Sequence, residues 1–215
     1  MRLQTLYRSL YRQHGAQHWW PGETPFEVMV GAVLTQNTAW RNVERAIANL
    51  RAVQLLSPTA ITGTPHARLA QLLRPSGYFN VKARRLHSYC RWYNEQGGFD
   101  ALTRLDTARL RTALLAVHGI GPETADDILL YAFQRPVFVV DAYTRRLLSR
   151  LALIQGNESY ETLRATIEGQ LGRADRLALF NEFHALIVMH AKHVCKPRPA
   201  CTHCCVARRC PAATS

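Results

Sequence analysis

The sequence predicts an all-α protein, and three observations favour that fold class. Apolar residues recur at helical spacing along most of the chain, beginning with Leu3, Leu6 and Leu10. Proline and glycine interrupt these stretches, for example at 75–77. Only residues 137–140, Val-Phe-Val-Val, have the composition of a strand, and so short a run fits a buried connector equally well.

Local signals place the individual helices. Thr24 is a good N-cap, Pro25 suits a first helical position and Glu27 completes a capping box, so a helix is expected over 26–34. The other stretches with helical periodicity before residue 137 cover 2–13, 40–50, 66–73, 81–95, 106–117 and 122–134.

The composition excludes several classes of protein. Of the 215 residues, 47% are hydrophobic and 20% are charged, which is too apolar for a disordered chain and too mixed for a fibrous one. No run of about 18 uninterrupted apolar residues is present, and the first residues lack the apolar core of a secretory signal. These features predict a soluble cytoplasmic protein that does not bind membranes.

The net charge of +12 predicts a polyanionic partner. It comes from 24 Arg and only three Lys, which are Lys82, Lys192 and Lys196. Arg binds phosphate well through its planar fork, although a general bias toward Arg in the source genome would give the same composition. The scarcity of Lys also leaves few candidates for an amine nucleophile.

Five of the six cysteines lie in the last 21 residues. Clustered thiols in a chain without a secretory signal indicate a metal site rather than disulfides. Four of them follow a C-x5-C-x2-C-x5-C spacing, which suits either a [4Fe–4S] cluster or structural zinc, and Cys205 is left over. The predicted ligands are Cys195, Cys201, Cys204 and Cys210.

Residues 114–125 contain the most informative turn. One helix ends in the apolar run before His118, and Gly119 and Gly121 then allow backbone conformations that are closed to other residues. Pro122 suits the first position of the next helix. The free N–H groups of such a helix start form an anion site for a DNA phosphate, although an ordinary structural turn would have the same pattern.

Asp141 ends the apolar run and begins an amphipathic helix. Its carboxylate is expected to cap that helix by accepting a backbone N–H. A carboxylate held in this way is rigid and ionised, so it also suits the stabilisation of positive charge that develops during a reaction.

These residues together resemble a known family. The hairpin reads HGIGPETAD, VVDAYTRR follows about 20 residues later, and PFEVMVGAVLTQNT and RPSGYFNVKARRL precede it. With the Cys ladder, this order resembles the helix-hairpin-helix DNA glycosylases of the endonuclease III superfamily over residues 19–210. The first gap of the ladder is one residue shorter than in endonuclease III.

The resemblance implies two helical lobes with a DNA groove between them. Residues 19–134 would form a six-helix barrel that carries the hairpin at about 106–134. Residues 1–18 and 135–215 would form the second lobe, with a [4Fe–4S] loop at 195–210. Enzymes of this kind flip a damaged nucleotide out of duplex DNA and cut its N-glycosidic bond.

The resemblance also implies roles for particular residues. Asp141 would be the catalytic carboxylate, and Gln36 would fill the space left by the flipped base. The other expected DNA contacts are Asn37, Lys82, Gly119, Gly121 and Arg145.

One departure from the family predicts the subclass. Endonuclease III has a Lys two residues after the second hairpin Gly, and its amine forms a Schiff base with the sugar. This chain has Glu123 at that position, and a carboxylate cannot form the imine. We therefore expect a monofunctional glycosylase with water as the nucleophile and little or no AP-lyase activity.

The segment HWWPGETPFEVMVGAVLTQNTAW resembles the 3-methyladenine glycosylase branch, whose aromatic side chains sandwich an electron-poor alkylated purine. A cationic methylpurine is attracted to indole faces, although the adjacent tryptophans would equally serve as a core or lobe-interface anchor. The matching positions are Trp19, Trp20, Pro21 and Trp40.

The prediction is therefore a base excision repair glycosylase that acts as a monomer on damaged double-stranded DNA, with water as its only cosubstrate. The main alternative is an endonuclease III-type glycosylase for oxidised pyrimidines with weak AP-lyase activity. A second alternative is a non-catalytic, cluster-bearing DNA-binding protein, because the capping role alone would account for Asp141.

Overall fold

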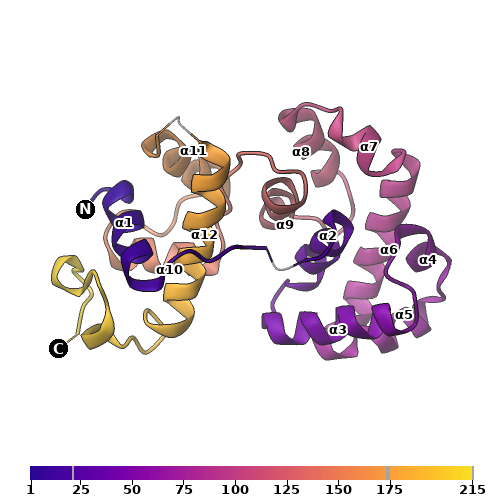
Figure 1. Cartoon of the computed structure of the whole chain (residues 1–215), viewed down its shortest axis with the longest axis horizontal. Coiled ribbons are helices and arrows are strands. Elements are labelled where there is room, and N and C mark those ends of the chain that lie inside the picture. The colour runs from indigo at the N-terminus through magenta and orange to yellow at the C-terminus, as the bar shows by residue number, and fades with distance from the viewer. Residues whose placement is uncertain (21, 173–174, 215) are drawn as a thin grey trace. The chain divides into compact units, whose positions relative to one another are not determined.

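The computed structural model describes residues 1–20, 22–172 and 175–214. Within these ranges the chain forms helices and turns but no strand, so the predicted all-α fold class is confirmed (Figure 1). No helix in the described ranges is long and apolar enough to span a membrane.

The chain divides into two compact units. One comprises Trp20–Arg135, and the other combines Met1–Trp19 with Pro136–Ser215. The boundaries expected from the sequence, 19–134 for the first unit, lie one residue from these.

The unit Trp20–Arg135 is built around α2 (Pro25–Leu34), in which every residue from Glu27 onward is buried. Its other helices are α3 (Trp40–Ala52), α4 (Pro58–Gly63), α5 (His66–Leu72), α6 (Phe79–Glu95), α7 (Gly98–Thr103), α8 (Thr107–Leu115) and α9 (Pro122–Asp127). α3, α6 and α9 pack directly against α2, which explains why α2 is apolar on all sides.

The start of α2 follows the expected pattern only in part. Thr24 is its N-cap, since the backbone N–H of Glu27 donates to Thr24 Oγ1 at 3.2 Å. The Glu27 carboxylate does not complete a capping box, because it accepts from Arg51 Nη2 of α3 at 2.7 Å. An ion pair between two helices has replaced the local bond.

A buried ion pair joins the two helices of the glycine hairpin. Asp126 of α9 is fully buried and accepts from Arg111 of α8 through Nε at 2.7 Å and Nη2 at 3.1 Å. This bidentate geometry is the strong form of an Arg–carboxylate contact. The pair therefore holds α8 and α9 in one arrangement around the turn between them.

The second hairpin helix is not a single regular helix over 122–134, as the sequence suggested. α9 ends at Asp127, and Ile128–Ala132 continues as a π-helical turn. The N–H of Phe133 donates to the carbonyl of Ile128, five residues back, at 3.1 Å. The wider turn keeps all five residues Ile128–Ala132 buried.

The other unit consists of α1 (Leu3–His14), α10 (Ala142–Arg150), α11 (Tyr160–Gln170) and α12 (Arg176–His193). Figure 1 shows α12 in orange beside α1 and α10, and both pack against it. Two short 3-10 turns, Cys201–His203 and Ala207–Arg209, follow in the Cys-rich loop.

Residues 137–140 form a buried connector rather than a strand. All four side chains are buried, and the ring of Phe138 packs edge-on against Phe180 of α12 at 5.6 Å between centroids. This packing anchors the residue that follows, Asp141, directly before α10.

Candidate active site

Asp141 is the N-cap of α10, as its position in the sequence predicts. The backbone N–H of Thr144 donates to Asp141 Oδ1 at 2.6 Å. The second carboxylate oxygen, Oδ2, lies 3.7 Å from His184 Nε2 of α12, which is too long for a hydrogen bond but within range of an ion pair. About 12% of the Asp141 side chain remains exposed, so the carboxylate is held from two sides and open on a third.

His184 is the partner that sequence reasoning missed. It is buried on α12, and the rings of Trp19 and Phe138 pack edge-on against it at 6.3 Å and 6.4 Å. A polar His within an apolar helical stretch is the signal that points to it, because a buried imidazole needs a polar partner. Its packing against two aromatic rings fixes its orientation toward the carboxylate.

The surroundings of Asp141 favour the charged carboxylate. Burial by itself would raise its pKa, but the His184 imidazole and the Thr144 N–H outweigh that effect, so the pKa of Asp141 lies below its ordinary value. An ionised carboxylate of fixed orientation stabilises a neighbouring positive charge without reorganising. This is the chemistry that an oxocarbenium-like sugar requires.

The glycine hairpin in the other unit carries a polar cluster of its own. Gln36 Nε2 donates to the carbonyl of Gly119 at 3.2 Å and to Thr124 Oγ1 at 2.9 Å. The Arg85 guanidinium donates to Gln36 Oε1. Gln36 therefore links α6 to both sides of the hairpin, and Asn37 beside it is exposed.

The two hairpin glycines have different physical roles. Gly119 has a φ of +87°, and a Cβ there would lie 2.3 Å from Arg85 Cγ, so both the conformation and the close approach require glycine. Gly121 has extended backbone, caps α9 and would meet nothing within 4 Å. The open side of the turn is thus at Gly121, where the first N–H groups of α9 begin.

Glu123 is exposed in the first turn of α9. A carboxylate in that position is stabilised by the positive end of the helix dipole. The residue that would be an amine in a lyase is therefore a helix-stabilising acid in this chain.

Lys82, which the sequence analysis expects to contact DNA, is not on the surface of its unit. The side chain is 1% exposed, and Nζ donates to the carbonyl of Ser76 at 2.6 Å. Burial, with a smaller effect of the nearby Arg85 charge, lowers the pKa of Lys82 to about 8. Its place on the inner face of α6 directs the amine to the turn before that helix.

Arg145 follows Asp141 on α10 and is half-buried. Its Nη1 donates to the carbonyl of Glu158 at 2.9 Å. The structure thus gives this arginine a contact inside its own unit, and a DNA contact would have to use its remaining donors.

The predicted aromatic residues do not all come together. Trp20 packs against Trp40 and Tyr131, with centroid distances of 5.1 Å and 5.0 Å. Trp19 belongs to the other unit, where it packs against His184. Pro21 lies outside the described residues. The sequence-adjacent tryptophans therefore belong to different clusters, and Tyr131 joins the cluster of Trp20 and Trp40 without any sequence signal.

The four cysteines expected to bind a cluster line one small cavity: Cys195, Cys201, Cys204 and Cys210. Burial and the neighbouring thiols raise the pKa of Cys204. No group of three or more His, Cys, Asp or Glu side chains in the described part of the chain is placed to hold a metal ion. Four thiols around one cavity are suitable ligands for a cluster. Their sulfur atoms are not placed in this structure so that they could coordinate a metal ion.

Two arginines of α10 hold the Cys-rich loop. Arg146 donates to the carbonyls of Cys195 and Ala191, both at 2.9 Å. Arg150 donates to Cys195 Sγ at 3.3 Å and to the Pro197 carbonyl at 2.8 Å. Their contacts tie the loop to the helix that Asp141 begins.

A hairpin, a capped aspartate and a Cys-rich loop follow one another along an all-helical chain in the order of the helix-hairpin-helix class of DNA repair proteins. Comparison with known proteins agrees, because residues 30–172 match the family described as HhH-GPD superfamily base excision DNA repair protein. The chain belongs to this superfamily.

Two curated relatives match over most of their length. A Methanocaldococcus jannaschii protein, named there as a candidate DNA repair glycosylase, is 44% identical over 208 residues, 95% of this chain and 94% of that protein. Endonuclease III of Sulfolobus acidocaldarius is 28% identical over 187 residues, 86% of this chain and 81% of that protein.

Solved structures have the same fold. The H. pylori 3-methyladenine DNA glycosylase bound to 1,N6-ethenoadenine matches with a TM-score of 0.77 at 29% identity, over 89% of this chain and 98% of its own. An endonuclease III–DNA complex matches with a TM-score of 0.83 at 20% identity, over 99% of this chain and 97% of its own, and at that identity it supports the fold alone.

The buried Lys82 generates a prediction about stability and pH. Its pKa is about 8 in the folded protein and about 10.5 when unfolded, so the unfolded chain binds more protons between these values. The cost of burying the charge is therefore present below pH 8 and is relieved as the pH rises toward 10.5. The free energy of unfolding of the wild type, relative to Lys82→Met, should increase over that range.

Urea unfolding of both proteins between pH 7.5 and 10 measures this difference. The comparison removes the contributions of tyrosines and cysteines that titrate in both proteins. Parallel pH profiles for wild type and Lys82→Met would show that Lys82 is not buried as a charge.

Proposed function

We propose that this protein is a monofunctional DNA N-glycosylase that releases an alkylated purine such as 3-methyladenine from duplex DNA. The observation that carries the proposal is the Asp141 carboxylate, which the Thr144 N–H and His184 hold at the start of α10 in a charged form. Membership of a base excision repair superfamily supplies the class of substrate, a damaged base in DNA.

Asp141 would act on the sugar rather than on the base. As the N-glycosidic bond lengthens, positive charge develops on the deoxyribose, and a fixed carboxylate stabilises it. The same carboxylate would orient the water that attacks the anomeric carbon and accept its proton. Thr144 and His184 are positioning residues in this scheme, because they contact Asp141 and not the substrate.

Water is the proposed nucleophile because this chain has no amine at the position where the lyase has its lysine. The position of the lyase amine is occupied by Glu123. Lys82 has a lowered pKa, but its Nζ is buried and donates to the carbonyl of Ser76. The two remaining lysines, Lys192 and Lys196, lie at the end of α12 and in the Cys-rich loop.

The choice of an alkylated purine rests on the aromatic cluster and on one relative. Trp20, Trp40 and Tyr131 form an aromatic cluster, and the π-face of an aromatic ring attracts a cationic base. The H. pylori structure, at 29% identity, is of a 3-methyladenine DNA glycosylase with a modified adenine bound. A cationic purine is also a good leaving group, so a carboxylate and a water would suffice.

An endonuclease III-type specificity for oxidised pyrimidines is the second candidate. The 28% identity to Sulfolobus acidocaldarius endonuclease III over 86% of this chain favours it. The two candidates differ in the base released, so a panel of lesions separates them.

We assign a structural [4Fe–4S] cluster to the four cysteines that share one cavity, with zinc as the alternative. When bound, the cluster would cross-link the loop covalently through its thiolate ligands and take no part in releasing the base. Arg146 and Arg150, which donate to Cys195, would neutralise part of the thiolate charge.

The function is tested by scoring base release from duplexes that carry methylated purines, ethenoadenine, oxidised pyrimidines or mismatches. We expect wild type to release the methylated purine most rapidly. Asp141→Asn should reduce the single-turnover rate by about 100-fold or more, because the amide still caps α10 but carries no charge.

Asp106→Asn is the matched control. Asp106 caps α8 in the same way, with its carboxylate accepting the N–H of Arg109 at 2.8 Å, and it lies outside the proposed site. Equal loss in both variants would assign the effect to helix capping. Release of no base from any duplex would refute the enzyme, and preferential release of oxidised pyrimidines would support the second candidate.

The cluster is tested by metal analysis of three proteins. Wild type and Cys205→Ser should be brown with about four irons per chain, whereas Cys204→Ser should lose iron, since only Cys204 of this adjacent pair lines the cavity. Colourless wild type with one zinc per chain would refute the iron assignment. Loss of iron in Cys205→Ser but not in Cys204→Ser would refute the ligand set.

A further inference from the structure

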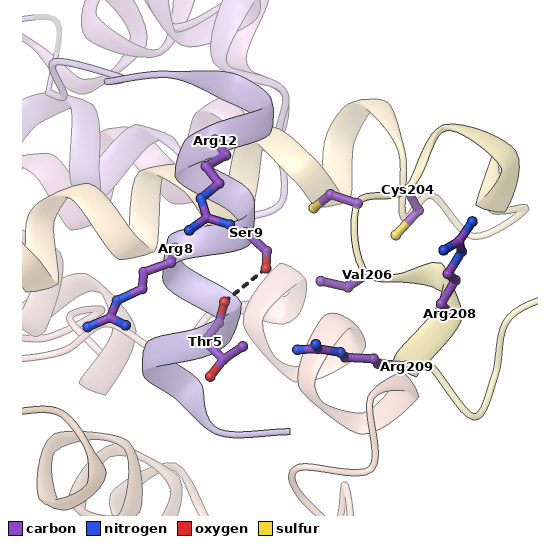
Figure 2. A pocket seen from close by; sticks show the side chains of 9 residues that line it. Thr5, Arg8, Ser9, Arg12, Cys204, Val206, Arg208 and Arg209 are labelled. Carbon is purple, nitrogen blue, oxygen red and sulfur yellow. Dashed lines mark hydrogen bonds between the residues drawn. The ribbon is translucent and has the colours of Figure 1, made fainter.

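A second cavity lies within the unit that contains Asp141, between α1 and the Cys-rich loop (Figure 2). Its volume is about 590 Å³. Four arginines line it: Arg8 and Arg12 come from α1, and Arg208 and Arg209 come from the loop. Figure 2 shows Arg209 extending from the loop toward α1.

The charge of this cavity is not balanced by the protein. No acidic side chain is among the described residues that line it. The four guanidinium groups are exposed, and none of them has a hydrogen-bond or ion-pair partner among the residues that the structure describes. Like charges held around one space repel each other, so an anion that enters is favoured.

The arrangement of α1 explains why these residues share one face. Thr5, Arg8, Ser9 and Arg12 follow the spacing i, i+3, i+4 and i+7, so a single stripe of the helix faces the cavity. The opposite face is apolar and buried, and it packs against α12. The arginines are therefore directed outward by the packing of the rest of the helix.

The two walls are held together by Gln13 of α1. Its Nε2 donates to the carbonyl of His203 at 2.7 Å, and its Oε1 accepts from the N–H of Cys205 at 3.1 Å. Both ends of one amide thus fasten the helix to the loop. A site held in this way loses little freedom when a ligand binds.

We propose that this cavity binds phosphate groups of the DNA backbone, at a site separate from the residues proposed to act on the damaged base. Guanidinium forks match phosphate oxygens in geometry and charge, and the hydroxyls of Thr5 and Ser9 add polar groups. None of the described residues that line the cavity is aromatic, so they offer no ring on which a base would stack. The contact is therefore independent of sequence and lesion.

The proposal rests on the proposed function only for DNA as the source of the phosphates. Free polyphosphate offers the same chemistry and is the other source. The test uses lesion-free duplex DNA, so it does not require base release. A protein that fails as a glycosylase can still pass this test.

The experiment measures the affinity of the purified full chain for a lesion-free duplex against salt concentration. The variant Arg8→Gln/Arg12→Gln keeps good helix formers on α1. We expect the slope of log K against log salt to fall in magnitude by about 2, since two phosphate contacts are lost. The control Arg68→Gln/Arg91→Gln removes the same charge from exposed positions on α5 and α6 and should retain more of the slope.

Circular dichroism and melting temperature confirm that both variants are folded. Equal slopes in the cavity variant and the control would overturn the proposal, because net charge alone would then explain binding. A parallel melt with tripolyphosphate distinguishes the sources. Stabilisation of wild type but not of the cavity variant, with unchanged DNA binding, would assign the cavity to free phosphates and overturn the DNA assignment.

Discussion

The fixed position of the Asp141 carboxylate is the constraint on which the surrounding unit depends. One oxygen accepts the Thr144 N–H and fixes the start of α10, while the other faces His184 of α12. The buried apolar connector 137–140 fixes the position of Asp141, which follows it. The rings of Phe138 and Trp19 pack against the His184 imidazole and hold it in place. Packing, capping and electrostatics therefore converge on one ionised group that stays partly open.

α10 connects this group to the Cys-rich loop. Asp141 caps its first turn, and further along Arg146 and Arg150 donate to Cys195 and its neighbours. Gln13 joins the same loop to α1, which packs on α12. These contacts hold Arg208 and Arg209 of the loop in place beside α1, while Asp141 is held at the start of α10.

In the other unit, hydrogen bonds of one side chain likewise hold the hairpin, since Gln36 joins Arg85, Gly119 and Thr124.

Local chemistry made much of this predictable from the sequence. Thr24 and Asp141 predict helix caps from their immediate neighbours, and Gly119 and Gly121 predict a turn. The spacing of the four cysteines predicts that they lie together. Contacts between distant segments were not predictable: His184 meets Asp141 across 43 residues, and Lys82 is turned inward by the packing of α6. The short helices α4 and α7 were missed because six residues show too little periodicity, although Ser57 and Pro58 mark the start of α4. The π-helical turn after Asp127 likewise has no local signal.

In the proposed mechanism, the fixed Asp141 carboxylate and a water molecule cut the glycosidic bond without an amine. Borohydride added during turnover of a methylated-purine duplex tests this mechanism, because it traps a Schiff base as a covalent protein–DNA adduct. Wild type should release the base and form no adduct, and Glu123→Lys offers an amine at the hairpin for comparison. A strong adduct with wild type, lost in a lysine variant, would show that an amine of this chain is the nucleophile.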